Sequence, residues 1–120
     1  DRGSNLPEWQ AHLSLALRNP PPGARIAHGF SIRVCQLRPK SRGVLKLRSA
    51  DPADPPRIDP RFLSDDSDFV SLQAGVGQMC EIAGQSPLAK LIKRPIDSAA
   101  FGGAASRAQW IRDYAETIYH

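Results

Sequence analysis

In the stretch Glu8-Trp9-Gln10-Ala11-His12-Leu13-Ser14-Leu15-Ala16-Leu17, polar and apolar residues alternate from Glu8 to Leu15. Because successive side chains of a β-strand point to opposite faces, this alternation predicts a strand over about residues 8–17. One face carries Trp9 and the leucines, and the other carries Gln10, His12 and Ser14. We expect the apolar face to pack on other elements, whereas the polar face can meet solvent or a ligand.

Two further strands are expected downstream of this one. Residues 28–38 alternate in the same way, and residues 44–50 follow after a turn that ends at Gly43. We expect Gly43 to take a positive φ there, which would close an antiparallel hairpin between the two strands. The proline-rich stretches 19–25 and 51–56 predict loops, because proline cannot donate a hydrogen bond to a sheet. The strands therefore predict one antiparallel β-sheet.

The hydrophobic spacing becomes helical in the second half of the chain. An amphipathic run with acidic residues before it and Gly84 after it predicts a helix over about residues 65–83. Gly75 and Gly77 lie inside this run, where glycine weakens a helix. We therefore expect another element to pack closely against them.

Two shorter helices are expected over about residues 87–93 and 106–119. Ser86 and Pro87 form a cap followed by proline in the first helical position, and Ser106 is the expected cap of the last helix. Strands first and helices after predict the α+β class, with an antiparallel β-sheet and the three helices packed against it.

The composition is that of an ordinary globular chain. Hydrophobic residues make up 41% of the 120 residues and charged residues 23%, which excludes a collagen-like or strongly disordered protein. No apolar run reaches the roughly 18 residues of a membrane-spanning helix, and we expect no secretory leader. Cys35 and Cys80 are expected to be reduced, with a disulfide between them as the alternative, and no metal site is expected. A cytoplasmic location follows as an expectation.

The net charge of +4 is unevenly distributed. Residues 1–62 hold 11 basic and 5 acidic side chains, and no acid interrupts the basic run from Arg33 to Arg48. Within residues 44–49 the basic residues alternate with leucines, so we interpret the run as the solvated face of a half-buried strand. Nucleic acid is not an expected partner, because no aromatic side chains interleave the basic ones. A basic binding or interaction domain without catalytic activity is the alternative function.

No complete catalytic motif can be found from the residues alone. The chain has no Gly-rich phosphate loop, no cluster of metal ligands and no nucleophile elbow. His12 lies in the middle of a predicted strand, His28 begins another, and His120 is the last residue of the sequence. The residue types by themselves indicate an α+β domain of unassigned function.

Three stretches in order nevertheless resemble one family. They are Arg38-Pro39-Lys40-Ser41-Arg42-Gly43-Val44-Leu45-Lys46-Leu47-Arg48-Ser49-Ala50-Asp51-Pro52, Pro56-Arg57-Ile58-Asp59-Pro60-Arg61-Phe62-Leu63-Ser64-Asp65 and Trp110-Ile111-Arg112-Asp113-Tyr114-Ala115-Glu116-Thr117-Ile118-Tyr119-His120. This combination resembles the C-terminal substrate-domain region of the glucose–methanol–choline (GMC) flavin-dependent oxidoreductases, and most closely the bacterial choline and alcohol dehydrogenase branch. Residues 7–12 resemble the strand that precedes this region.

The resemblance implies a catalytic base at His120, which would take the hydroxyl proton of a substrate while hydride leaves to the flavin. It also implies His12 and Gln10 as substrate-binding candidates. Residues 1–120 would then be a partial substrate-binding domain, with the FAD-binding domain absent from this chain. FAD belongs to the parent enzyme, and we expect neither bound FAD nor activity from these residues alone.

The expected substrate of the parent enzyme is a small alcohol. Choline and a generic primary alcohol both stay open, because Glu8 and Trp9 do not make a convincing cage for a quaternary ammonium. The resemblance favours a dehydrogenase over an oxidase and leaves membrane association of the parent open. It also implies contacts to the FAD domain, so we expect exposed apolar surface near both ends of the chain.

Overall fold

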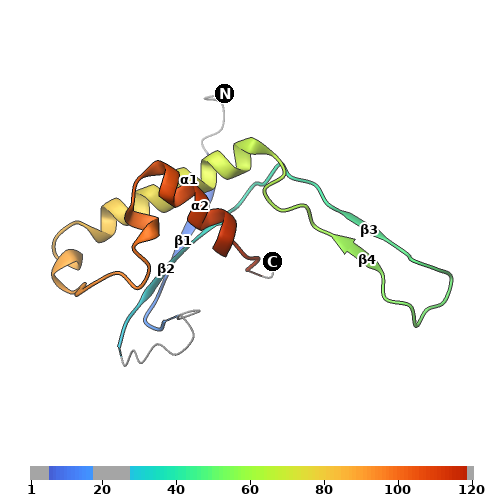
Figure 1. Ribbon diagram of the computed structural model, residues 1–120, viewed down its shortest axis with the longest axis horizontal. Helices are drawn as coiled ribbons and strands as arrows, with labels where there is room; N and C mark the ends of the chain where they lie inside the picture. Colours follow the sequence, from blue (N-terminus) through green and yellow to red (C-terminus); the bar gives the residue numbers. More distant parts are fainter. Residues whose placement is uncertain (1–5, 18–27, 119–120) are drawn as a thin grey trace.

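The structure is a computed structural model that describes residues 6–17 and 28–118. Two sheets of two strands each and two α-helices confirm the α+β class (Figure 1). Along the chain the elements are β1 (Trp9–Ser14), β2 (Ser31–Gln36), β3 (Val44–Lys46), β4 (Arg57–Asp59), α1 (Asp66–Ala83), the 3-10 turns η1 (Leu88–Lys90) and η2 (Ala99–Phe101), and α2 (Ala104–Tyr114).

The strands form two separate antiparallel ribbons instead of the single sheet expected. β1 pairs with β2, with Trp9 opposite Gln36 and Ser14 opposite Ser31. β3 pairs with β4, which is not among the strands expected from the sequence. The expected hairpin between residues 28–38 and 44–50 is therefore wrong. The chain does not reverse after β2, because the next residues are held by the start of α1.

Asp68 is the residue that holds them. Its buried carboxylate accepts hydrogen bonds from the backbone N–H groups of Lys40, at 2.8 Å, and Ser41, at 2.7 Å. The Ser41 hydroxyl also donates to Asp68 and accepts from the backbone N–H of Asp65, at 3.1 Å. Burial acts to raise the pKa of the Asp68 carboxyl, but these hydrogen bonds outweigh it and keep the pKa below its ordinary value.

The body of the molecule is the β1–β2 ribbon with α1, η1, η2 and α2. α1 packs on both strands, and an added Cβ at Gly75 would lie 2.9 Å from Val34 Cγ1 and 3.1 Å from Trp9 Cδ2. At Gly77 it would lie 2.9 Å from Arg107 Nη1. The expected close packing at these two glycines is confirmed, and it explains why glycine stands in the middle of this helix.

α1 begins and ends close to the residues that the sequence predicts. Asp65 is the N-cap and accepts a hydrogen bond from the backbone N–H of Ser67 at 2.9 Å, and Gly84 is the C-cap. Residues from α1, η2 and α2 share the small core, namely Leu72, Ala83, Ala100 and Ile111. The Arg112 guanidinium lies 4.1 Å from the centroid of the Phe69 ring, which adds a contact between the two helices.

The two later helices differ from expectation. Residues 87–93 contain only the 3-10 turn η1. The last helix covers 104–114 instead of 106–119, and it packs on α1 and η2 rather than on the strands. Ser106 does not cap it, because its hydroxyl donates to the carbonyl of Ala99 at 2.9 Å and Gly103 occupies the N-cap. Beyond Tyr114 the described chain is extended.

Residues 38–62, hereafter the arm, leave the body and carry β3 and β4 (Figure 1). The arm raises the Cα radius of gyration to 17.5 Å, against about 14 Å for a compact domain of this length. The half-buried strand expected at residues 44–50 is wrong, since Leu45 and Leu47 are exposed. The described part of the chain includes no helix that is long and apolar enough to cross a membrane.

Gly43, near the base of the arm, does not have the positive φ that we expected. Among the described glycines only Gly103 has a positive φ, of 90°. An added Cβ at Gly43 would instead lie 2.3 Å from the carbonyl oxygen of Asp59. The two strands of the arm approach so closely there that only glycine fits.

Candidate functional site

The candidate site is the face of the β1–β2 ribbon that points away from α1. Trp9 and Val34 lie against Gly75 of α1, so the residues next to them in each strand point to the opposite side. Three directly opposed pairs make up this face, hereafter the polar face: Gln10 with Cys35, His12 with Arg33, and Ser14 with Ser31. Directly opposed residues share a face of an antiparallel pair, so the register brings these side chains together.

His12 and Cys35 contact each other on the polar face. The Cys35 Sγ and the His12 Nε2 are 3.7 Å apart, within hydrogen-bond reach for sulfur. The ring nitrogens of an imidazole can donate or accept a hydrogen bond, so His12 can bind a hydroxyl group in either role. Cys35 and Cys80 are both free, as expected. Cys80 lies elsewhere, where burial raises the pKa of its thiol.

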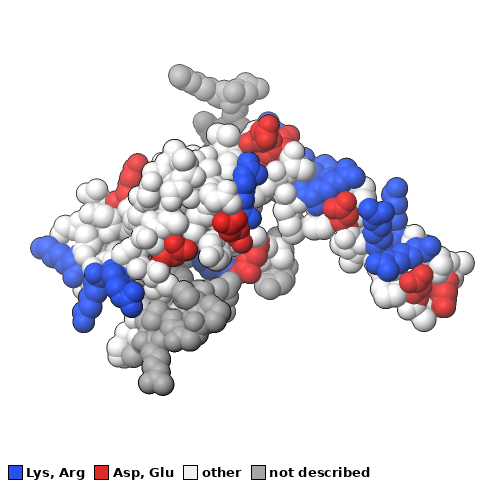
Figure 2. All heavy atoms as spheres, viewed as in Figure 1, with Lys and Arg blue, Asp and Glu red and all other residues white. Residues whose placement is uncertain are grey.

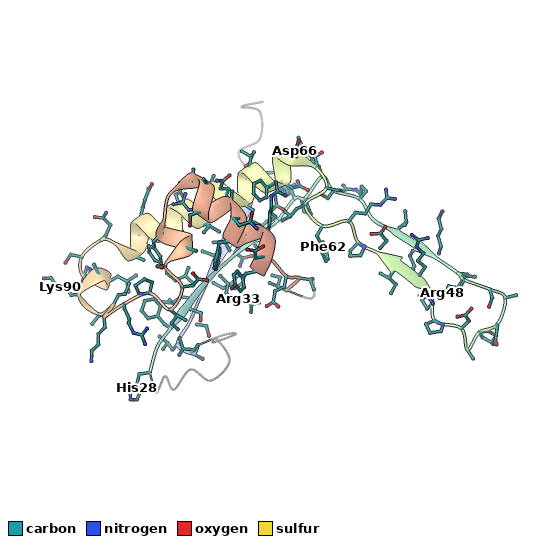
Figure 3. The ribbon with its side chains drawn as sticks, viewed as in Figure 1. His28, Arg33, Arg48, Phe62, Asp66 and Lys90 are labelled. Atoms are coloured by element: carbon teal, nitrogen blue, oxygen red, sulfur yellow. The ribbon has the colours of Figure 1, made fainter. Side chains whose placement is uncertain are left out.

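Arg33 connects the polar face to the segment that follows α2. Its Nη2 lies 3.3 Å from the Oε1 of Glu116, and both side chains are partly exposed. Figure 3 shows Arg33 below the end of α2, while His28 lies at the outer end of β2. The ion pair therefore ties residues 115–118 to the strand position directly opposite His12.

Two of the three site residues expected from the sequence lie on the polar face. Gln10 and His12 lie two positions apart on the polar face, as the alternation predicts. His120 lies outside the described residues, two positions after Ile118, so its role as catalytic base stays a prediction. The structure adds Arg33 and Glu116 to the candidate site. They are 83 positions apart, and no local pattern could have paired them.

Apart from the polar face, the described residues form a recess of about 440 Å³ beside α2. Its lining includes Trp110 and Tyr114, whose ring centroids are 5.8 Å apart, together with Asp97 and Asp113. Both carboxylates already accept hydrogen bonds, Asp97 from the Trp110 Nε1–H at 2.7 Å and Asp113 from the Gln109 amide at 2.8 Å. We assign this recess to packing around α2, because both of its carboxylates are already hydrogen-bonded to neighbouring side chains.

No group of three or more metal-ligating side chains occurs within residues 6–17 and 28–118. The longest helix, α1, begins with Asp65, Asp66 and Asp68. Their negative charges oppose an anion at this helix N-terminus, so it is not a favourable place for the diphosphate of a cofactor.

Comparison with known families identifies the family of this chain. Residues 39–120 match the family described as GMC oxidoreductase. The chain belongs to the GMC oxidoreductase family. The resemblance drawn from the sequence is thereby confirmed, and the matching region contains the arm, both helices and the segment that carries Glu116.

Relatives of this GMC chain carry names of related activities. It is 40% identical to "Alcohol dehydrogenase [acceptor]" of Pseudomonas putida over 96 residues, which are 79% of this chain and 17% of the relative. It is 34% identical to "Glucose dehydrogenase [FAD, quinone]" of Drosophila pseudoobscura pseudoobscura, over 87% of this chain and 18% of the relative. "Oxygen-dependent choline dehydrogenase" of Brucella ovis is 31% identical over 98% of this chain and 22% of the relative. The chain therefore spans about a fifth of the length of these relatives.

Proposed function

We propose that this GMC chain is part of the substrate-binding domain of a flavin-dependent alcohol oxidoreductase, which oxidises a CH–OH group to a carbonyl. The observation that carries the proposal is the Arg33–Glu116 ion pair. It draws the segment that leads to His120 toward the face that bears His12 and Gln10. Family membership and the names of the relatives support the same reaction class.

In this proposal His120 is the general base and takes the hydroxyl proton of the substrate. An imidazole suits this step, because its ordinary pKa lies near neutral pH. His12 and Gln10 orient the substrate oxygen through hydrogen bonds from the polar face. FAD, when bound by the rest of the enzyme, supplies the hydride acceptor.

A small uncharged alcohol is the substrate class that we propose. Recognition of a quaternary ammonium requires aromatic faces around the cation. Trp9 is turned toward α1, against Gly75, and so points away from the polar face. The described polar face carries no aromatic side chain among its paired residues. This favours a generic primary alcohol over choline, and a dehydrogenase stays the preferred form of the enzyme.

The 120 residues alone are proposed to bind no FAD and to lack activity. They would form contacts to the FAD domain in the full-length enzyme. The cytoplasmic location and the absence of nucleic-acid binding stay predictions. A basic binding module is the alternative function, and a strongly salt-dependent retention on heparin or DNA by the full-length protein would favour it.

Anaerobic flavin reduction by the full-length polypeptide tests the proposal. Primary alcohols should bleach the flavin absorbance, and His120→Asn should slow the reduction by about 10²- to 10⁴-fold, the usual contribution of a positioned base. His28→Asn is the matched control, because His28 is exposed and lies away from Arg33 (Figure 3). A polypeptide that binds no flavin, or a His120→Asn variant that reduces it at the original rate, would contradict the proposal.

A further inference from the structure

The arm presents an apolar face that nothing in the described chain covers. Leu45 lies directly opposite Ile58 in the β3–β4 register, so both side chains are on one face of the ribbon. Their exposed fractions are 69% and 68%, and that of Leu47, two positions from Leu45 on the same strand, is 83%. Scattered exposed leucines are ordinary, but three on one narrow face indicate an interaction surface.

The other face of the arm is charged. Lys46 lies opposite Arg57. Over residues 38–62 the chain has seven Lys and Arg against three Asp, a balance of +4, whereas the remaining residues hold nine of each sign. The arm therefore carries the entire net charge of the sequence, and Figure 2 shows basic side chains along its length.

The arm is held in a defined direction although it touches little. Among the described helices and strands, β3 and β4 contact only each other. An isolated two-stranded ribbon is marginally stable in water. At its base, however, Asp68 binds the backbone of residues 40–41. Between β4 and α1, Arg61 and Leu63 have left-handed φ angles of 48° and 56°, a conformation that non-glycine residues keep only when their surroundings impose it.

We propose that the arm docks, by Leu45, Leu47 and Ile58, into an apolar groove edged with carboxylates in the part of the full-length GMC polypeptide outside these 120 residues. Removal of the three side chains from water supplies the attraction. Lys46 and Arg57 lie on the opposite face, and their long side chains would reach past the edges of the ribbon to carboxylates at the rim of the groove. The inference rests on the proposed place of this chain within a longer flavoenzyme, of which it spans about a fifth.

A second copy of the chain is a less suitable occupant. Two arms packed against each other would bring together two segments that each carry a balance of +4. Like charges at close range repel. The rest of the same polypeptide is also present at a fixed, high effective concentration.

Hydrogen–deuterium exchange on the full-length, FAD-loaded protein tests the docking. A free ribbon should exchange its amides at close to unprotected rates, whereas a docked arm should be slowed at least about 100-fold over residues 44–59. Leu45→Ser with Ile58→Ser should remove most of this protection. Val70→Ser is the matched control, since Val70 is equally exposed but lies on α1. Unprotected arm amides in the unaltered protein, with α1 still protected, would overturn the inference.

Zero-length carbodiimide cross-linking tests the nature of the partner. Lys46 should link to an Asp or Glu of the same polypeptide outside these 120 residues, and Lys90, exposed on η1, is the comparison lysine. Links from Lys46 between two copies, or no links from Lys46 while Lys90 reacts, would contradict the acidic rim. Neither measurement reads activity. A protein that reduces its flavin with alcohol but leaves the arm unprotected would retain the proposed function and lose only this inference.

Discussion

The body and the arm both begin from an antiparallel strand pair, but the two pairs bury their side chains to different extents. In the body, α1 covers the Trp9 and Val34 side of the β1–β2 ribbon. In the arm, Leu45 and Ile58 lie directly opposite each other on a ribbon face that no described element covers. The difference shows that alternation predicts which residues share a face but not whether that face is buried. Burial depends on a third element, which the body has and the arm lacks.

Ile111→Ala should have the largest effect on stability and should act on the body. Ile111 is only 2% exposed, and truncation of a buried isoleucine costs about 2–5 kcal/mol through lost burial and the cavity that remains. Leu91→Ala is the control, because Leu91 is 74% exposed and should change the free energy of unfolding by less than about 0.5 kcal/mol. Chemical denaturation of the full-length protein measures both. Equal effects would mean that the body has no distinct core.

Asp68→Asn should weaken the junction between body and arm. The substitution removes a charged acceptor from backbone donors of Lys40 and Ser41, and a buried donor left unpaired costs about 1–3 kcal/mol. Exchange at residues 40–41 should rise, and a variant with unchanged exchange there would contradict the role of Asp68 as the anchor. Asp66→Asn is the control, since Asp66 is exposed at the same helix end.

Asp68 should also make the junction between body and arm less stable at acidic pH. The folded pKa of Asp68 lies below its ordinary value of 3.8, so the carboxylate contributes its full stability above that pH. The contribution is lost as the pH falls through the lower, folded pKa. A plot of unfolding free energy against pH should therefore fall below about pH 4, and less steeply in Asp68→Asn. If the unfolding free energies of the two proteins fell equally steeply below about pH 4, Asp68 would not be the cause of the acid sensitivity.

Gly75→Ala should destabilise the body by a moderate amount, while Gly77→Ala should be nearly neutral. At Gly75 the new methyl meets Val34 and the Trp9 ring, and overpacking of this kind costs about 1–3 kcal/mol. Better helix propensity returns about 1 kcal/mol. At Gly77 the nearest atoms belong to the end of the flexible Arg107 side chain, which can move aside. Thermal unfolding of both variants measures the contrast, and the reverse order would contradict the packing of α1 on the ribbon.

Breaking the Arg33–Glu116 pair should have the smallest effect on stability. Both side chains are partly exposed, and such pairs contribute about 0–1 kcal/mol. If the pair positions the segment before His120, Arg33→Glu should lower kcat of alcohol-dependent flavin reduction, and the double variant with Glu116→Arg should recover it. Arg94→Glu, an exposed basic residue outside the site, is the control. Loss of stability without loss of kcat would reduce the pair to a structural contact.

Much of the body could be predicted from local pattern. The helix over about 65–83, its end at Gly84 and the close approach at Gly75 all follow from residues within one segment, because helical period and glycine positions are local properties. The predictions that are wrong concern contacts between distant segments. The expected pairing of β3 with β2 is wrong, because the alternation within so short a strand fits either neighbour equally well.

In the candidate site, too, one part could be predicted from local pattern and another part could not. Alternation alone placed Gln10 and His12 together on one strand face. By local pattern Arg33 is one member of a basic run, and Glu116 falls within the helix expected over 106–119. Their contact required the chain to leave α2 at Tyr114 and return to β2.

By itself, the sequence determined the α+β class, the faces of β1, the long helix and the GMC resemblance, because each depends on residue types at short, regular spacing. The folded chain determined what those faces meet. Asp68 prevents the hairpin after β2 and turns β3 out into the arm, and Arg33 binds Glu116 across the molecule. The physical reason is that hydrogen bonds and ion pairs between distant segments depend on the whole path of the chain, which no local periodicity encodes.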